Sequence, residues 1–437
     1  MRHGEGTTSF RPILLFPLLA VFLAFFAVWK QSQKPKSEYL PSVLAHPGDF
    51  PERTWTPEER AAQKHLKPKI RQQPIPPALA NLGLRPDWED LSCFQKTITR
   101  ETFLNRLTQI YTKNGGFEKW ITVGNDHALI KHSGGEFKLQ FSSSAQTPPG
   151  AIWNWKSKVI LPHKKEAPLL GYHIALDPGH IGGSFAAIEE RHLKYGNHPA
   201  IEEGTMTLLT AQHLKPLLEA QGARVTLIRE TNEPITPTRP SDYRTGRSQR
   251  VAEKLFYRTA EIRARAELIN HTIQPDFVIC LHYNATGSPV PTPGQDFHIL
   301  LNGAYHESEL KHEDERFQML QRLLSGTICE EIPLATAIAQ SFAKSTELPA
   351  YEYRPDHPYS VRIDQYLFAR NLLANRLYLC PVIFLEPYTM NSTEFIERHK
   401  AGDYEGFKMV DGKMRLSVYR EYAQAVADGI TSYYSSE

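Results

Sequence analysis

The chain has 437 residues, enough to bury a large core and to form two or three domains. Its 50 Lys and Arg residues nearly balance its 48 Asp and Glu residues, so it lacks a basic field and no nucleic-acid partner is expected. A hydrophobic content of 41% and an aromatic content of 11% are typical of an ordinary folded protein.

Near the start of the sequence, residues 12–29 form an apolar run without a charged residue. The run is just long enough to cross a bilayer, so we expect residues 1–30 to be a signal anchor or a cleaved signal peptide. The anchor is favoured because no small-residue cleavage site follows Trp29. The rest of the chain would then lie outside the cytoplasm, on the periplasmic side of the inner membrane, or be secreted if the signal is cleaved.

Two further segments precede the part of the chain with the candidate site. Residues 31–84 are rich in proline and lack a long apolar period, which is typical of an extended linker. Residues 85–165 are predicted to form a small α+β accessory module. In that module, helical spacing after Thr99 is followed by short strand-like runs separated by glycine pairs. Nothing in the module indicates catalysis.

From residue 168 to the C-terminus, strand patterns alternate with helical patterns. This alternation predicts an α/β domain with a mostly parallel central sheet flanked by helices. We expect helices at residues 205–220, 257–269 and 415–434, and strands at residues 224–228, 276–282 and 381–386.

Three apolar runs in this part of the chain lead to residues that can bind or serve a divalent metal, namely His180, His282 and Glu386. Short runs rich in valine and isoleucine are typical of buried strands in a parallel sheet. Ligands bind outside the carboxyl ends of such strands. We therefore expect the three side chains to meet at one edge of the sheet.

The order of these motifs resembles that of the zinc-dependent N-acetylmuramoyl-L-alanine amidases. The family motif close to D-x-G-H-G-G corresponds to residues 177–183, and the motif S-I-H-x-N-A corresponds to residues 280–285. The family's ligand glutamate opens a helix and corresponds to Glu203. The last family block, close to V-L-V-E-x-G-F-x-S-N, corresponds to residues 382–391 and contains Glu386.

This resemblance covers residues 168–437 and implies that they form a zinc amidase catalytic domain. The implied reaction is hydrolysis of the amide bond between N-acetylmuramic acid and L-alanine, which makes peptidoglycan the expected partner. A protein activator is a further possible partner of unknown identity. The alternatives are a zinc peptidase that cleaves a stem-peptide amide, and a non-catalytic wall-binding protein.

The chemistry of these side chains agrees with the resemblance. His180, Glu203 and His282 would give one Zn²⁺ ion three protein ligands and leave the fourth position open, as in catalytic sites. Glu202 is the alternative to Glu203, although counting back from the helical leucines favours Glu203. Glu386 would act as general base and then as general acid.

Other interpretations of the site residues stay open at this point. Glu386 has an alternative role as a buried structural carboxylate that pairs with an arginine such as Arg258 or Arg265. Asp177 is expected to orient a ligand imidazole from behind. The insert at residues 189–202, EERHLKYGNHPAIE, is predicted to form a loop at the mouth of the site.

A long segment, about residues 302–375, separates the second histidine from Glu386 and contains an acidic run. The run is expected to be a solvated helix face. The alternative hypothesis is that one of its carboxylates reaches the metal and gates the site, with Glu307, Glu309, Glu313 and Glu315 as candidates.

The four cysteines are widely spaced and form no CxxC pair. Cys280 and Cys380 lie in apolar runs and are predicted to be buried free thiols. Export would permit disulfides, so the state of Cys93 and Cys329 stays open.

Overall fold

The computed structural model describes residues 73–74, 84–143, 155–158, 166–288, 290–354 and 357–436. The apolar run at residues 12–29 lies outside them, as does most of the predicted linker. Among the helices that the model describes, none is both long enough and apolar enough to cross a membrane. All described residues fall in one compact unit of the chain.

A seven-stranded sheet forms the centre of this unit, with the strand order β12-β13-β11-β14-β10-β6-β9. The four neighbouring strands β14, β10, β6 and β9 are parallel to one another. The predicted parallel sheet is thus confirmed for this half, but the whole sheet is mixed, because β11 is antiparallel to β14 and β12 is antiparallel to β13. The strands are β6 (His173–Pro178), β9 (Arg224–Leu227), β10 (Phe277–Leu281), β11 (Phe297–Leu301), β12 (Val361–Arg362), β13 (Leu367–Ala369) and β14 (Val382–Pro387).

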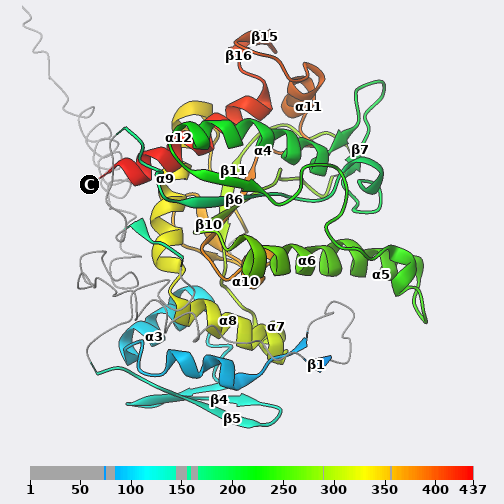
Figure 1. Ribbon diagram of the computed structural model, residues 1–437. Helices are drawn as coiled ribbons and strands as arrows, with labels where there is room; N and C mark the ends of the chain where they lie inside the picture. The colour runs from blue at the N-terminus through cyan, green and yellow to red at the C-terminus, as the bar shows by residue number, and fades with distance from the viewer. Residues whose placement is uncertain are drawn as a thin grey trace, which may run out of the picture. The chain divides into compact units, whose positions relative to one another are not determined.

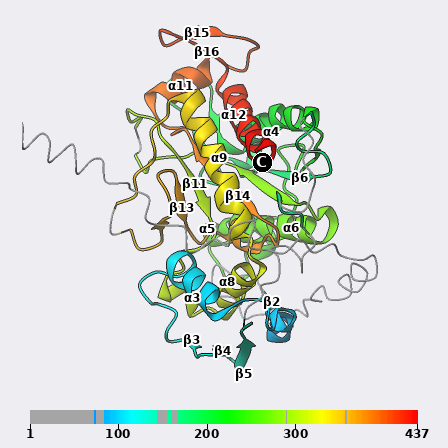
Figure 2. The same ribbon diagram turned by 90° about the vertical axis from the view of Figure 1, so that its left-hand side faces the viewer.

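Helices cover both faces of the sheet, which explains why β6 and β10 are buried along their whole length. Figures 1 and 2 show α4, α9 and α12 packed together on one face, with α6 and α10 on the other. The predicted helices are therefore confirmed as flanking layers. Their bounds are α4 (Glu203–Ala220), α5 (Gln249–Lys254), α6 (Glu261–Glu267), α9 (Ile328–Thr346), α10 (Leu373–Leu377) and α12 (Val418–Ser435).

The helix predicted at residues 257–269 is part of a longer helical run. In that run α5, the π-helical turn η7 (Leu255–Ala260), α6 and the π-helical turn η8 (Leu268–Ile273) follow one another without a break. The run ends at Gln274, which has a left-handed backbone with φ of 50°. Its α6 segment contacts the turn after β6, because Arg265 donates a hydrogen bond to the carbonyl of His180 at 2.7 Å.

The predicted accessory module contains helical turns followed by a three-stranded antiparallel sheet. Thr99 caps α3, because its side chain accepts a hydrogen bond from the backbone of Thr102 at 3.2 Å, as its position in the sequence predicts. The elements are η2 (Trp88–Phe94), α3 (Arg100–Arg106), η3 (Leu107–Tyr111), β3 (Ile121–Val123), β4 (His127–His132) and β5 (Gly135–Gln140).

This module packs against α8 (Glu313–Ser325), which lies in the segment between the second histidine and Glu386. The indole of Trp88 meets Phe317 edge to face, with ring centroids 5.4 Å apart, and donates to Glu313 at 2.9 Å. The buried Arg106 donates to the carbonyl of Leu323 at 2.9 Å. Helix α8 thus joins the module to the sheet domain.

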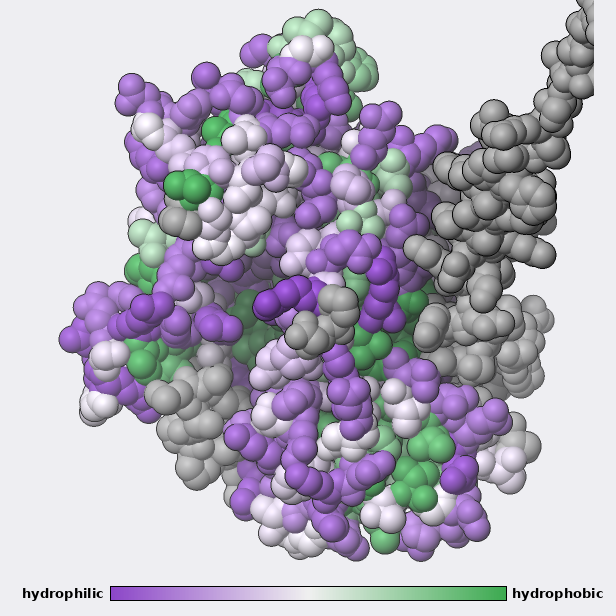
Figure 3. Space-filling model, turned by 180° about the vertical axis from the view of Figure 1, so that it is seen from behind, coloured by the Kyte–Doolittle hydropathy of each residue, from purple (hydrophilic) through white to green (hydrophobic). Residues whose placement is uncertain are grey.

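Beyond the sheet, α11 (Thr393–Lys400) precedes a short hairpin of β15 (Lys408–Val410) and β16 (Lys413–Arg415). Pale green atoms at the top of Figure 3 mark this hairpin. Its apolar side chains are well exposed: Phe407 is 67%, Met409 61% and Met414 57% exposed.

All four cysteines are free thiols. Cys280 and Cys380 are buried, which confirms the prediction that they pack in the core. Cys93 and Cys329, whose state the sequence leaves open, are partly exposed and unpaired with each other.

Candidate metal centre

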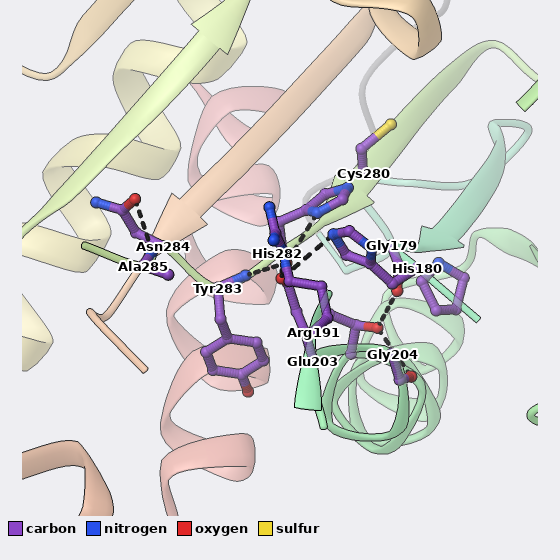
Figure 4. Close-up of polar contacts among 12 residues, drawn as sticks. Gly179, His180, Arg191, Glu203, Gly204, Cys280, His282, Tyr283, Asn284 and Ala285 are labelled. Atoms are coloured by element: carbon purple, nitrogen blue, oxygen red, sulfur yellow. Dashed lines mark hydrogen bonds and ion pairs between the residues drawn. The ribbon is translucent and has the colours of Figure 1, made fainter. Parts of the chain in front are cut away.

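Two histidines and one glutamate from separate elements meet at the carboxyl end of the central strands. His180 follows β6, His282 follows β10, and Glu203 is the first residue of α4. One ligand atom from each side chain lies within 4.8 Å of those of the other two, so the three residues could hold a metal ion. Figure 4 shows the Glu203 carboxylate between the two imidazoles. Its oxygens lie 3.2 Å from His180 Nε2 and 3.0 Å from His282 Nδ1.

Close backbone packing brings these elements together. A Cβ on Gly179 would collide with the imidazole of His282, so only glycine leaves room for that ring. Likewise, a Cβ on Gly204 would collide with the backbone of Gly182, which lets the start of α4 touch the turn that carries His180. His180 itself has a left-handed backbone, with φ of 57°.

The charge of Glu203 is fixed by its surroundings. Burial alone would raise its pKa, but His180, His282 and Arg191 together lower that pKa to about 2. The backbone amide of Tyr283 also donates to this carboxylate at 3.1 Å. Glu203 therefore stays ionised, which is the state in which a carboxylate can bind a metal ion.

Glu202, the alternative to Glu203 in the sequence, faces away from the cluster. Its carboxylate accepts a hydrogen bond from the Thr205 hydroxyl at 2.9 Å and lies 4.0 Å from His192. The geometry thus brings Glu203, and not Glu202, to the two histidines.

Sequence reasoning missed a carboxylate behind His180. Glu189 lies with one oxygen 3.3 Å from His180 Nδ1, the ring nitrogen that points away from Glu203. The backbone amides of Ile181 and Gly182 donate to Glu189 at distances of 2.9 to 3.1 Å, and its carboxylate is almost fully buried. Burial tends to raise its pKa, but His180 and the two amides hold the pKa below its ordinary value.

The expectation that Asp177 orients an imidazole is wrong. Asp177 is buried and accepts hydrogen bonds from Arg265 at 2.7 Å and from the Tyr378 hydroxyl at 2.6 Å. Arg265 in turn donates to the carbonyl of His180 at 2.7 Å and to Glu261 at 2.7 Å. Asp177 therefore acts on the histidine only through an arginine that holds its backbone.

A second buried arginine holds the same turn from the other side. Arg229 donates to the carbonyls of Pro178, at 3.1 Å, and of Gly204. Arg229 and Arg265 together donate hydrogen bonds to backbone carbonyls of this turn that have no partner within the sheet. Both arginines help to fix the position of His180.

Glu386 lies in β14 next to His282, because Leu281 pairs with Leu385 in the parallel register. Burial raises the pKa of Glu386 to about 8, and repulsion from Glu203 adds to the rise. No described residue donates a hydrogen bond to its carboxylate. The interpretation of Glu386 as the partner of Arg265 is wrong, because Arg265 pairs with Asp177 and Glu261.

The insert at residues 189–202 lies at the site, as its sequence predicts. Strands β7 (His192–Leu193) and β8 (Ile201–Glu202) pair as an antiparallel ribbon in this insert. It provides Glu189 behind His180 and also Arg191, whose Nε lies 2.9 Å from the Glu203 carboxylate. The role of Arg191 has no signal in the sequence, since charged residues are common in exposed loops.

The acidic run does not reach the metal cluster, which contradicts the gating hypothesis. Its carboxylates bind the accessory module or the segment around α10 instead. The contacts are Glu307 with Lys119, Glu309 with Asn371, Glu313 with Trp88 and Ser133, and Glu315 with Asn371 and Arg376.

Fold and site together define a class: an α/β domain that gathers two histidines and a glutamate at its sheet edge, beside an unpaired carboxylate. Residues 174–394 match the family model for N-acetylmuramoyl-L-alanine amidase. The chain belongs to this family.

Known relatives cover parts of the chain. The germination-specific N-acetylmuramoyl-L-alanine amidase of Bacillus subtilis (strain 168) is 30% identical over 173 residues, which are 40% of this chain and 56% of the relative. The probable cell wall amidase LytH of Staphylococcus saprophyticus is 33% identical over 101 residues, 22% of this chain and 33% of the relative. The chain thus spans about half the length of the first relative and a third of the second. Among solved structures, the N-acetylmuramyl-L-alanine amidase Ami1 of Mycobacterium smegmatis has a TM-score of 0.37 and 18% identity, covering 62% of this chain and 99% of that one.

Proposed function

We propose that the chain is a zinc-dependent amidase that hydrolyses the bond between N-acetylmuramic acid and L-alanine in peptidoglycan. The observation that carries the proposal is the cluster of His180, Glu203 and His282 beside the free carboxylate of Glu386. Family membership supports the choice of substrate.

The donor set of the cluster fits zinc. Two imidazole nitrogens and one carboxylate oxygen are common zinc ligands, and three protein ligands leave a position for a reacting molecule. The imidazoles are partly exposed whereas Glu203 is buried, so a substrate can approach from the histidine side. A zinc ion bound there would lower the pKa of a bound water and polarise the scissile carbonyl.

The side chains around the cluster have distinct proposed roles. Glu189 accepts a hydrogen bond from the Nδ1–H group of His180 and leaves Nε2 free as the metal ligand. Glu386 takes a proton from the attacking water on its carboxylate oxygen and delivers a proton to the amine of the leaving alanine. A raised pKa suits the second step, because the protonated acid must persist near neutral pH.

The remaining parts of the chain complete this proposal. Residues 168–437 form the catalytic domain and residues 85–165 an accessory module, with residues 31–84 as a linker. Residues 1–30 anchor the protein with its catalytic domain on the wall side of the membrane, or direct its secretion. An activator protein belongs to the proposal only as a partner of unknown identity.

Digestion of purified sacculi tests the reaction. The expected products are peptides with a free N-terminal L-alanine and glycan strands without peptide, identified by mass spectrometry. Cleavage inside the peptide would show a peptidase instead, and binding without any product would show a wall-binding protein.

Two kinds of variant test the assigned roles. Glu386→Gln should keep bound zinc and lose at least 100-fold in rate, as expected when a general acid–base is removed. The matched control is Glu397→Gln, an exposed position on α11 that should keep full activity. His180→Ala and His282→Ala should each lose zinc by elemental analysis, and full zinc occupancy in both would contradict the metal site.

A further inference from the structure

A group of polar and aromatic side chains lies beyond Glu386, on the side away from the metal cluster. His298 in β11 pairs directly with Glu386 across the antiparallel register. Directly opposed residues point to the same face of a sheet, with Cβ atoms about 5 Å apart. His298 is therefore an immediate neighbour of the proposed general base.

His298 has a hydrogen-bonding capacity that its neighbours leave unused. Its side chain is buried, Nε2 lies 3.3 Å from the Tyr353 hydroxyl, and the ring of Tyr351 stacks on it at 4.5 Å. Its Nδ1 atom is also buried but has no hydrogen-bond partner in the described part of the chain. Burial lowers the pKa of His298 to about 3, so the ring is neutral. This Nδ1 nitrogen can therefore make one further hydrogen bond, to a water molecule or to a group of a ligand.

Arg370 completes the group. It follows β13, and its guanidinium donates to the Tyr353 hydroxyl at 3.3 Å. It is half-buried, and no carboxylate among the described residues forms an ion pair with it, although its charge acts to lower the pKa of Glu386. By contrast, Arg362 in the neighbouring strand β12 binds the carboxylate of Glu352 with both terminal nitrogens, at 3.0 and 3.1 Å. A half-buried guanidinium that forms no ion pair with a carboxylate is suited to bind one from a ligand.

We propose that His298, Tyr351, Tyr353 and Arg370 form a subsite for the peptide side of the substrate, in which Arg370 binds the α-carboxylate of the residue after the alanine. This inference rests on the proposed function and adds a chemical preference to it: an α-carboxylate at the second peptide residue is favoured over an α-carboxamide.

The order of the strands explains why the peptide lies on this side. The metal cluster is at β6 and β10, Glu386 is on the next strand, β14, and β11 and β13 lie beyond it. Because Glu386 delivers the proton to the departing amine, the peptide attached to that amine continues toward β11 and β13. Two strand spacings are about 10 Å, and two extended residues span about 7 Å. The arginine side chain is long enough to span the remaining distance between the second peptide residue and β13.

Two synthetic substrates test the subsite. N-acetylmuramoyl-L-alanyl-D-glutamate and N-acetylmuramoyl-L-alanyl-D-isoglutamine differ only in an α-carboxylate and an α-carboxamide. The protein should cleave the first with a kcat/KM at least 10-fold higher, since a site built for a polar group rejects an analogue that leaves it unpaired. Arg370→Gln should remove this preference, and Arg370→Lys should retain part of it. The control Arg362→Gln, at a paired and exposed arginine, should keep the full preference.

Binding measurements separate the two levels of the proposal. Calorimetric titration of the product peptides L-alanyl-D-glutamate and L-alanyl-D-isoglutamine into the zinc-loaded protein reports on the subsite without hydrolysis. Equal cleavage of both substrates together with equal binding of both peptides would overturn the subsite and leave the amidase function intact. Cleavage of neither substrate nor sacculi would instead overturn the function, whatever the peptide binding shows.

Discussion

A histidine ligand needs a partner for its second ring nitrogen, because that partner fixes the tautomer and the orientation of the ring. Glu189 has this position behind His180, and two backbone amides hold its carboxylate in place. Ionised Glu189 can only accept, so it selects the His180 tautomer that carries its proton on Nδ1. His180, as a proposed metal ligand, and Glu189 thus act as one unit, although eight residues separate them in the sequence.

Glu189→Gln tests this arrangement. The amide can still fill the space but can present a donor to Nδ1, so zinc affinity should fall about 10- to 100-fold. Competition with a chromogenic chelator measures the change. Glu190→Gln is the control, since Glu190 is exposed and pairs with Arg250, and its zinc affinity should match that of the unmodified protein. Equal affinities for all three proteins would remove Glu189 from the site.

A second prediction concerns Glu330, a buried carboxylate far from the cluster in the sequence. Burial raises its pKa to about 7, although the Tyr434 hydroxyl donates to it at 2.9 Å. The pKa of Glu330 in the folded state lies above its ordinary value of 4.5. Its contribution to the stability of the fold is therefore fully present below about pH 4.5, where the carboxyl is protonated in both states. That contribution is lost as the pH rises through about 7. The loss is on the order of 3 kcal/mol.

Denaturant unfolding measured at pH values from about 5 to about 9, on both sides of the expected transition, gives the free energy of unfolding that checks this prediction. The free energy of unfolding of Glu330→Gln should depend less on pH than that of the unmodified protein. The exposed Glu267→Gln should show the same pH dependence as the unmodified protein. Parallel pH profiles for all three would contradict the assignment.

At the scale of elements, the central strands and main helices could be predicted because their sequences carry strong local signals. β6, β10 and β14 coincide with short apolar runs, which are typical of buried strands. β11 could not be placed: its run, FHILL, has no signal for antiparallel pairing, which depends on a distant strand. The sheet is mixed because β11 pairs antiparallel with β14 and β12 pairs antiparallel with β13.

In the candidate site, too, some residues could be predicted from the sequence and others could not. His180, His282 and Glu386 could be predicted to lie together because parallel strands end at a common edge. Glu189 and Arg191 could not, since a loop has no periodicity that assigns a direction to its side chains. The role of Asp177 was predicted wrongly because position at a strand end does not reveal that a buried arginine stands between it and the histidine.

The contact between α3 and α8 gives a prediction at this scale. Arg106 is buried and binds the carbonyl of Leu323, so Arg106→Ala leaves that acceptor unpaired and opens a cavity. We expect a loss of on the order of 2–4 kcal/mol in the free energy of unfolding. Arg100→Ala, at an exposed position on the same helix, should change it by less than about 0.5 kcal/mol. Similar values for the two variants would show that the module contributes little to stability.

At the scale of the whole molecule, a metal at the cluster would tie together β6, β10 and α4, which are far apart in the sequence. A ligand that binds only the folded state stabilises it, by about 2.7 kcal/mol at a concentration 100-fold above its Kd. Removal of zinc with a chelator should therefore lower Tm, and added zinc should restore it. His180→Ala is the control, because its Tm should not respond to zinc. An unchanged Tm in the unmodified protein would contradict a metal shared by three elements.

The left-handed backbone at His180 has a consequence for any attempt to evolve or engineer this protein. A residue with a side chain pays roughly 1–2 kcal/mol for that conformation, whereas glycine adopts it freely. In the absence of zinc, selection for thermal stability alone will thus tend to accept glycine at position 180, and the resulting proteins will lack one of the three proposed metal ligands. Libraries screened by heat resistance in metal-free buffer should hold this position constant, because the backbone conformation favours glycine there whereas the proposed metal site requires histidine.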